Sequence, residues 1–129
     1  MNIGIVAKKS GLDAKTIRYY ESIELVTLPL RGANGYREYS EENLQELVFL
    51  RHARQFGFSI EECRQLLNLW LNPARQSAEV HALVTEKVDE IEKRIRELKR
   101  MKKLLTQLMS NCADDENPEC VIIDTLASL

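Results

Sequence analysis

The sequence predicts a mainly α-helical protein, with a small helical head followed by one long helix that pairs with another helix. Within residues 1–75, apolar residues recur at helical spacing in short runs that Gly11 and Pro73 separate. The run from Ser77 to Met109 contains neither proline nor glycine and carries a heptad pattern. The 129 residues, 44% hydrophobic and 29% charged, are ordinary for a soluble protein with one modest domain and an extension.

We expect two short helices at the N-terminus, joined by a glycine turn. The apolar residues from Ile3 to Ala7 have the spacing of one helix face, and Gly11 ends that helix. Asp13 can cap a second helix that runs through Glu21. Two short helices joined in this way predict a helix-turn-helix.

The second helix carries a polar stripe opposite its inward residue, Ile17. The stripe consists of Lys15, Arg18, Tyr19 and Ser22. A recognition helix would present cations and rings of this kind to the major groove of DNA. The same pattern also fits an ordinary solvated helix face, and periodicity alone does not separate the two interpretations.

Residues 31–39 predict an exposed β-hairpin. Asn34-Gly35 is a strong signal for a tight hairpin turn, because both residue types accept positive φ. The hairpin carries Arg31, Tyr36 and Arg37, so basic and aromatic residues lie together beside the helix-turn-helix. Such a wing would grip phosphates, although a hairpin by itself is more often only scaffold.

Two further helices complete the head. Ser40 can cap a helix that ends at Gly57, and Ser59 with Glu62 forms a capping box for the next helix. The apolar stripe of that helix consists of Ile60, Cys63, Leu67 and Trp70. Cys63 therefore faces the core as a small apolar residue rather than as a metal ligand.

The run from Ser77 to Met109 predicts a helix about 50 Å long. Its apolar seam has alternating spacings of four and three with a single gap at Lys102, and consists of Val84, Val88, Ile91, Ile95, Leu98, Leu105 and Met109. Because the rest of the chain offers only short helices, we expect the same helix of a second copy as partner, in a homodimer. The alternative is that the helix folds back on its own head.

The net charge of −2 conceals two unequal ends. Residues 1–40 hold six Lys and Arg against four Asp and Glu, whereas residues 101–129 hold two against five. A nucleic-acid partner therefore belongs at the N-terminal end. No apolar run approaches the roughly 20 residues of a membrane span and no secretory signal is evident. Together with three cysteines that have no disulfide-framework spacing, this predicts a cytoplasmic protein.

Cys112 and Cys120 flank a polar loop directly after the long helix. Two thiols at this spacing fit a redox disulfide or a metal clamp, and neither spacing nor count separates these two readings. The two histidines, His52 and His81, are distant in sequence, so a tetrahedral Zn²⁺ site would need carboxylates or groups of a partner chain. Two thiolates alone suit a soft ion that accepts two ligands: Cu(I), Ag(I) or Au(I).

The last residues predict a short helix with one apolar face, formed by Ile122, Leu126 and Leu129. We expect it to dock on the long helix and exclude water from the thiol loop. The sequence contains no paired carboxylates, no nucleophile with its base and no phosphate-binding loop, so we do not expect an enzyme.

Five segments of the chain together carry a more specific pattern. They are Val6-Ala7, Ser10-Gly11-Leu12, Thr16-Ile17-Arg18-Tyr19-Tyr20-Glu21, Asn34-Gly35-Tyr36-Arg37 and the segment from Arg51 to Phe58. In order and spacing they resemble the MerR family of metal-responsive transcription regulators. The resemblance implies a winged helix-turn-helix head, an antiparallel coiled-coil dimer and an effector loop. It also implies promoter DNA with a palindromic operator, RNA polymerase at that promoter, and activation by distortion of the DNA.

The resemblance also assigns roles to individual residues. The DNA-binding set that it implies is Lys15, Thr16, Arg18, Tyr19, Tyr20, Arg31, Tyr36 and Arg37. Cys112 and Cys120, with Ser77 at the start of the long helix, look like the copper-efflux (CueR) branch, in which the two cysteines bind metal. Divalent-metal branches carry a cysteine in place of Ser77. A monovalent ion between two thiolates keeps a net charge of about −1, which a helix N-terminus can stabilise, whereas a divalent ion prefers a third thiolate. We therefore expect Ser77 to set metal selectivity.

The sequence thus predicts three parts. These are a winged helix-turn-helix DNA-binding domain at residues 1–75, a dimerisation helix at 76–110, and a metal-binding loop with a short helix at 111–129. We expect a Cu(I)-responsive regulator that activates copper-efflux or detoxification genes. The alternatives are a sensor of a divalent ion (Zn²⁺, Hg²⁺ or Cd²⁺) and a metal-buffering chaperone without an operator.

Overall fold

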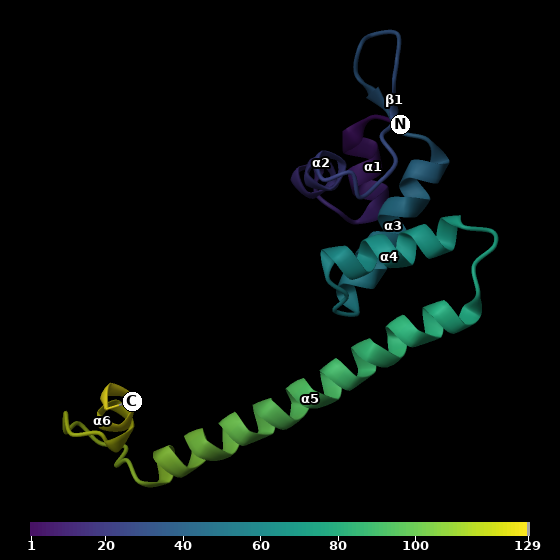
Figure 1. Cartoon of the computed structure of the whole chain (residues 1–129). Coiled ribbons are helices and arrows are strands. Elements are labelled where there is room, and N and C mark those ends of the chain that lie inside the picture. The colour runs from purple at the N-terminus through teal and green to yellow at the C-terminus, as the bar shows by residue number, and fades with distance from the viewer. Residues whose placement is uncertain (129) are drawn as a thin grey trace. The chain divides into compact units, whose positions relative to one another are not determined.

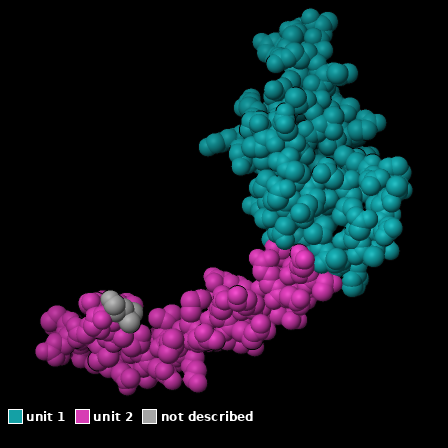
Figure 2. Space-filling view, in the orientation of Figure 1, with its two compact units in different colours: residues 1–84 teal, residues 85–129 magenta. Residues whose placement is uncertain are grey.

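The structure is a computed structural model that describes residues 1–128. It is mainly helical, and its elements follow one another as α1 (Ile3–Ser10), α2 (Ala14–Ser22), β1 (Leu30–Arg31), β2 (Arg37–Glu38), α3 (Glu41–Gln55), α4 (Ile60–Leu71), α5 (Ser77–Ser110) and α6 (Val121–Ala127) (Figure 1). The chain divides into two compact units, residues 1–84 and residues 85–129 (Figure 2).

The predicted helix-turn-helix is present at the N-terminus of the first unit. The side chain of Asp13 accepts a hydrogen bond from the backbone N–H of Thr16 at 2.7 Å and so caps α2. Gly11 ends α1 with φ = 78°, and a Cβ atom at this position would lie 3.0 Å from the side chain of Arg51. The turn therefore needs glycine for its backbone conformation, and the Arg51 side chain would have to shift to admit a Cβ atom.

The core of the first unit lies between its helices. Its most deeply buried apolar side chains are Val6, Ile17, Leu47, Leu50 and Cys63, and the core position predicted for Cys63 is confirmed. Both predicted caps are also confirmed: Ser40 caps α3, and Ser59 with Glu62 forms the capping box of α4. Trp70 departs from the predicted stripe, because 36% of it is exposed. Its ring instead stacks on Phe49, with ring centroids 4.7 Å apart.

The predicted hairpin is present, but its turn is longer than Asn34-Gly35 indicates. Leu30 pairs with Glu38 and Arg31 with Arg37, so residues 32–36 form the connection. Gly35 has φ = 80°, whereas Asn34 does not adopt positive φ. Asn34 acts through its side chain, whose Oδ1 accepts from the N–H of Tyr36 at 3.0 Å. The tight turn that Asn34-Gly35 indicates is therefore replaced by a longer connection, in which an Asx-type hydrogen bond of Asn34 contributes to the turn.

The long helix α5 begins at Ser77, as predicted. In the single chain its seven seam residues each remain between 43% and 68% exposed. Among residues 1–128, no helix is both long and apolar enough to cross a membrane.

The predicted C-terminal helix is present as α6, but its packing against α5 is loose. Ile122 is half-buried and Leu126 is 56% exposed, while Leu129 lies outside the described residues. An apolar hollow of about 670 Å³ remains between α6 and the end of α5, lined among others by Met101, Leu104 and Leu108. The expected seal over the thiol loop is therefore incomplete in the single chain.

Candidate nucleic-acid and metal sites

The outward face of α2 is arranged as the sequence predicts. Lys15, Arg18, Tyr19 and Ser22 are all exposed, while Ile17 on the opposite face is completely buried. Thr16 is half-buried and its backbone is engaged in the cap of the helix. One face of α2 therefore offers a cation, a guanidinium group, a ring and a hydroxyl to a ligand.

Tyr20 does not belong to this face. Only 5% of the residue is exposed, and its ring lies in the hydrophobic core. Burial raises the pKa of the phenol, so the hydroxyl stays neutral at physiological pH. This burial argues against the direct DNA contact expected for Tyr20. The sequence did not reveal it, because neither the motif nor helical spacing indicates how deeply the ring packs.

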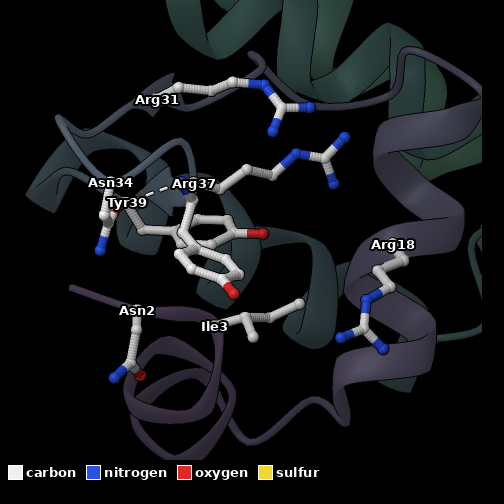
Figure 3. Close-up of a pocket in the computed structure, with 8 residues that line it drawn as sticks. Asn2, Ile3, Arg18, Arg31, Asn34, Arg37 and Tyr39 are labelled. Carbon is white, nitrogen blue, oxygen red and sulfur yellow. Dashed lines mark hydrogen bonds between the residues drawn. The ribbon is translucent and has the colours of Figure 1, made fainter.

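Three arginines from three elements surround one hollow of the first unit (Figure 3). Arg18 comes from α2, Arg31 from β1 and Arg37 from β2, and the remaining lining residues are Asn2, Ile3, Asn34, Tyr36 and Tyr39. The hollow has a volume of about 480 Å³. Guanidinium groups around such a hollow match the charge and hydrogen-bonding geometry of phosphate oxygens.

A buried carboxylate ties the wing to α2. The side chain of Glu21 is 2% exposed and forms an ion pair with Arg37. The hydroxyl of Tyr39 donates to the other oxygen of Glu21 at 2.6 Å. Burial, with the hydrogen bond to Glu21, raises the pKa of Tyr39 to about 12.

The Nη1 group of Arg37 is thus engaged by Glu21 and is not free to contact a ligand. The sequence interpretation missed this role of Glu21. In the sequence, Glu21 lies near a predicted helix end, and Arg37 and Tyr39 follow in and after the hairpin. This order alone does not show that the three side chains meet.

The two loop cysteines lie side by side. The Sγ atoms of Cys112 and Cys120 are 2.8 Å apart, and both residues are half-buried. The loop residues 113–119 are all exposed. Within residues 1–128, no group of three or more His, Cys, Asp or Glu side chains is placed to hold a metal ion together.

The contact between the two thiols makes them chemically unequal. The hydrogen bond between the sulfurs raises the pKa of Cys112 and lowers the pKa of Cys120. The backbone N–H groups of Ile123 and Ile122 lower the pKa of Cys120 further. Cys120 therefore ionises first and accepts a hydrogen bond from the Cys112 thiol, so the two act as one donor pair.

Ser77 is the exposed first residue of α5. It lies beside an open hollow that Pro73, Arg75, Val80 and His81 also line. Arg75 donates to the carbonyl oxygens of Trp70 and Asn72 at 3.2 and 3.3 Å, which holds the segment that leads into α5.

Comparisons with known proteins match both the helical head and the long helix of this chain. The family profile described as "MerR HTH family regulatory protein" matches residues 1–70, and the profile "MerR, DNA binding" matches residues 44–108. The HTH-type transcriptional regulator CueR of Salmonella typhimurium is 51% identical over 127 residues, which are 98% of this chain and 92% of that protein.

Two solved structures extend the likeness to the fold. The transcription regulator PbrR691 from Ralstonia metallidurans CH34, in complex with lead(II), is 35% identical with a TM-score of 0.86, and the match covers 98% of both chains. MerR of Bacillus megaterium MB1, in complex with mercury(II), is 30% identical with a TM-score of 0.75, over 98% of this chain and 99% of that one. Since the helix-turn-helix, the wing and the long helix are matched in both sequence and fold, this chain belongs to the MerR family of helix-turn-helix transcription regulators.

Proposed function

We propose that this chain is a Cu(I)-responsive transcriptional activator that works as a homodimer on a palindromic operator. One observation carries the choice of metal: Cys112 and Cys120 lie with their Sγ atoms 2.8 Å apart, and no third metal-ligating side chain of residues 1–128 joins them. Two soft thiolates without hard oxygen ligands fit a soft monovalent ion that accepts two ligands. Ag(I) and Au(I) share this chemistry. The 51% identity to a CueR regulator supports the same choice.

In this proposal residues 1–75 bind DNA, residues 76–110 form the dimerisation helix and residues 111–129 hold the metal. The exposed seam of α5 supports pairing with a second copy, because a row of apolar residues at heptad spacing is stable only when another helix covers it. The antiparallel direction of that pairing rests on the family resemblance alone.

The proposed DNA contacts come from α2 and the wing. They are Lys15, Thr16, Arg18, Tyr19, Arg31, Tyr36 and Arg37, without the buried Tyr20. Apo and metal-bound dimers bind the same operator, and metal favours the conformation in which the DNA is distorted for RNA polymerase at a copper-efflux promoter. Metal shifts that balance only through its different affinity for the two states.

The test is to load the purified dimer with Cu(I) and to read the ligand number by X-ray absorption. We expect two sulfur ligands per ion, from Cys112 and Cys120. A third or fourth donor would contradict the assignment. Zn²⁺ competition against a chelator of known strength should leave the Cu(I) site undisturbed.

A sensor of a divalent ion is the second candidate, because the similar PbrR691 and MerR structures contain lead(II) and mercury(II). We propose that Ser77 excludes this function by withholding a third thiolate from the thiol pair of the partner subunit, which it reaches in the antiparallel dimer that the family resemblance implies. Ser77→Cys should therefore tighten Zn²⁺ binding, while Ala82→Cys, exposed more than one turn further along α5 and distant in sequence from Cys112 and Cys120, serves as the control. Equal Zn²⁺ affinity in wild type and Ser77→Cys would favour the divalent sensor.

A further inference from the structure

The C-terminal end of α2 has an unusual backbone. Ile23 caps the helix, and the next residue, Glu24, has φ = 56°. Glu24 is the one non-glycine residue in the described part of the chain with positive φ. Helices commonly end in this left-handed conformation, but glycine is the usual residue because a Cβ atom is unfavourable there.

Arg64 of α4 binds directly to this strained turn. Its Nη1 donates to the carbonyl oxygen of Glu24 and its Nη2 to that of Ile23, each at 3.0 Å. These carbonyl groups lie 40 and 41 residues away in sequence. The Nε atom of Arg64 also lies 3.5 Å from the carboxylate of Glu61, one turn earlier on α4.

The chemistry of this contact suits its place. Carbonyl groups at a helix C-terminus lack intrahelical partners and carry the negative end of the helix dipole, so a cation stabilises them. The planar guanidinium group reaches both carbonyls with one fixed fork, which restricts rotation of the helix end as well as its position. Arg18 and Tyr19 lie within about one turn of this end of α2, so their placement depends on it.

We propose that Arg64 is a positioning residue for DNA recognition: it holds the C-terminal end of α2 against α4 and so sets the angle at which the exposed face of α2 meets base edges. The inference rests on the proposed use of α2 as the recognition helix. Hydrogen bonds to base edges are directional, whereas phosphate contacts tolerate small rotations. Loss of Arg64 should therefore reduce sequence discrimination more than general DNA affinity.

The experiment separates positioning from simple stabilisation by means of Glu24. Glycine accepts φ = 56° without strain, so Glu24→Gly relieves the turn while it leaves the backbone carbonyls in place. The variants are Arg64→Met, Glu24→Gly and the two combined, with Gln65→Met on the exposed face of α4 as control. A duplex is first selected from a random library with full-length wild-type protein. Dissociation constants for that duplex and for a scrambled duplex are then measured with each variant, together with Tm.

Arg64→Met should lose about tenfold in affinity for the selected duplex, equivalent to about 1.4 kcal/mol, but less than about twofold for the scrambled one. Its Tm should fall. The combined variant should recover the wild-type Tm but should remain about tenfold weaker than wild type on the selected duplex. Glu24→Gly and Gln65→Met should bind both duplexes as the wild type does.

Two outcomes would overturn the inference alone: Arg64→Met that discriminates as wild type does, or a combined variant that regains discrimination together with Tm. In the second case Arg64 would act only by stabilising the turn. Failure of the wild-type protein to select any duplex would overturn the proposed recognition by α2 and this inference with it.

Discussion

At the scale of single residues, the buried carboxylate of Glu21 joins two elements of the first unit. Arg37 and Tyr39 both bind it, so it fixes the wing to α2. Because the group is almost entirely buried, each partner that is removed leaves part of its charge unsatisfied.

Tyr39→Phe should lower the free energy of unfolding by about 1–3 kcal/mol, because a hydrogen bond to a buried charged group is lost. Urea denaturation measures the change. Tyr36→Phe is the matched control, since Tyr36 is 75% exposed. If both variants unfold at the same urea concentration, the hydroxyl of Tyr39 contributes nothing to the network.

The raised pKa of Tyr39 predicts a loss of stability at alkaline pH. Below the ordinary phenol pKa of 10, Tyr39 is neutral in both the folded and the unfolded chain. Between pH 10 and its folded pKa of about 12, the unfolded chain releases this proton more readily, so unfolding becomes easier as pH rises. The contribution is complete below pH 10 and is lost as pH passes 12. Urea titrations from pH 9 to about 12 should show the wild-type advantage over Tyr39→Phe shrinking, and a constant advantage would contradict this origin.

At the scale of elements, the DNA contacts proposed for α2 and for the wing differ in kind. Arg18 is exposed on α2, so Arg18→Ala should cost about 1–3 kcal/mol of operator binding if it contacts a base edge, and it should relax sequence preference. Arg37→Ala should weaken binding to all DNA and also lower Tm, because it leaves Glu21 without its cation. Binding to operator and scrambled duplexes, with melting curves, distinguishes the two. The same loss on both duplexes for Arg18→Ala would mean that it reads no base.

The second prediction at this scale concerns the apolar seam of α5. Ile95 sits at the centre of the apolar seam and is 45% exposed in the single chain. Ile95→Asp should dissociate the dimer, because a coiled-coil interface offers the new charge neither a partner nor water. Arg96→Asp, one position outside the seam, is the control. Sedimentation that shows an intact Ile95→Asp dimer would place the interface elsewhere.

At the scale of the whole molecule, the proposed DNA contacts and the proposed metal ligands belong to different compact units. Cys112→Ser or Cys120→Ser should therefore abolish activation by Cu(I) in a promoter assay and leave operator affinity within about twofold of wild type. Glu116→Gln in the same loop is the control, since this residue is exposed. A normal Cu(I) response in either serine variant would exclude the thiol pair as the effector site.

The sequence by itself determined the features that depend on neighbours along the chain. Capping residues such as Asp13 and Ser59 specified where helices begin, since a cap involves only the next three residues. The heptad spacing specified the long helix from Ser77, because helical periodicity is a local property. The thiol pair was readable in the same way, as two cysteines that close one short loop.

Only the tertiary structure decided which side chains meet across elements. It buried Tyr20, paired Glu21 with Arg37 16 residues away, and set Arg64 on the backbone of Glu24 40 residues away. Spacing along a helix shows which face a residue occupies, but not what packs against that face. Glutamate also has no local preference for positive φ, and the side chain that donates to the Glu24 carbonyl comes from α4, far along the chain, so the sequence around Glu24 did not reveal this turn.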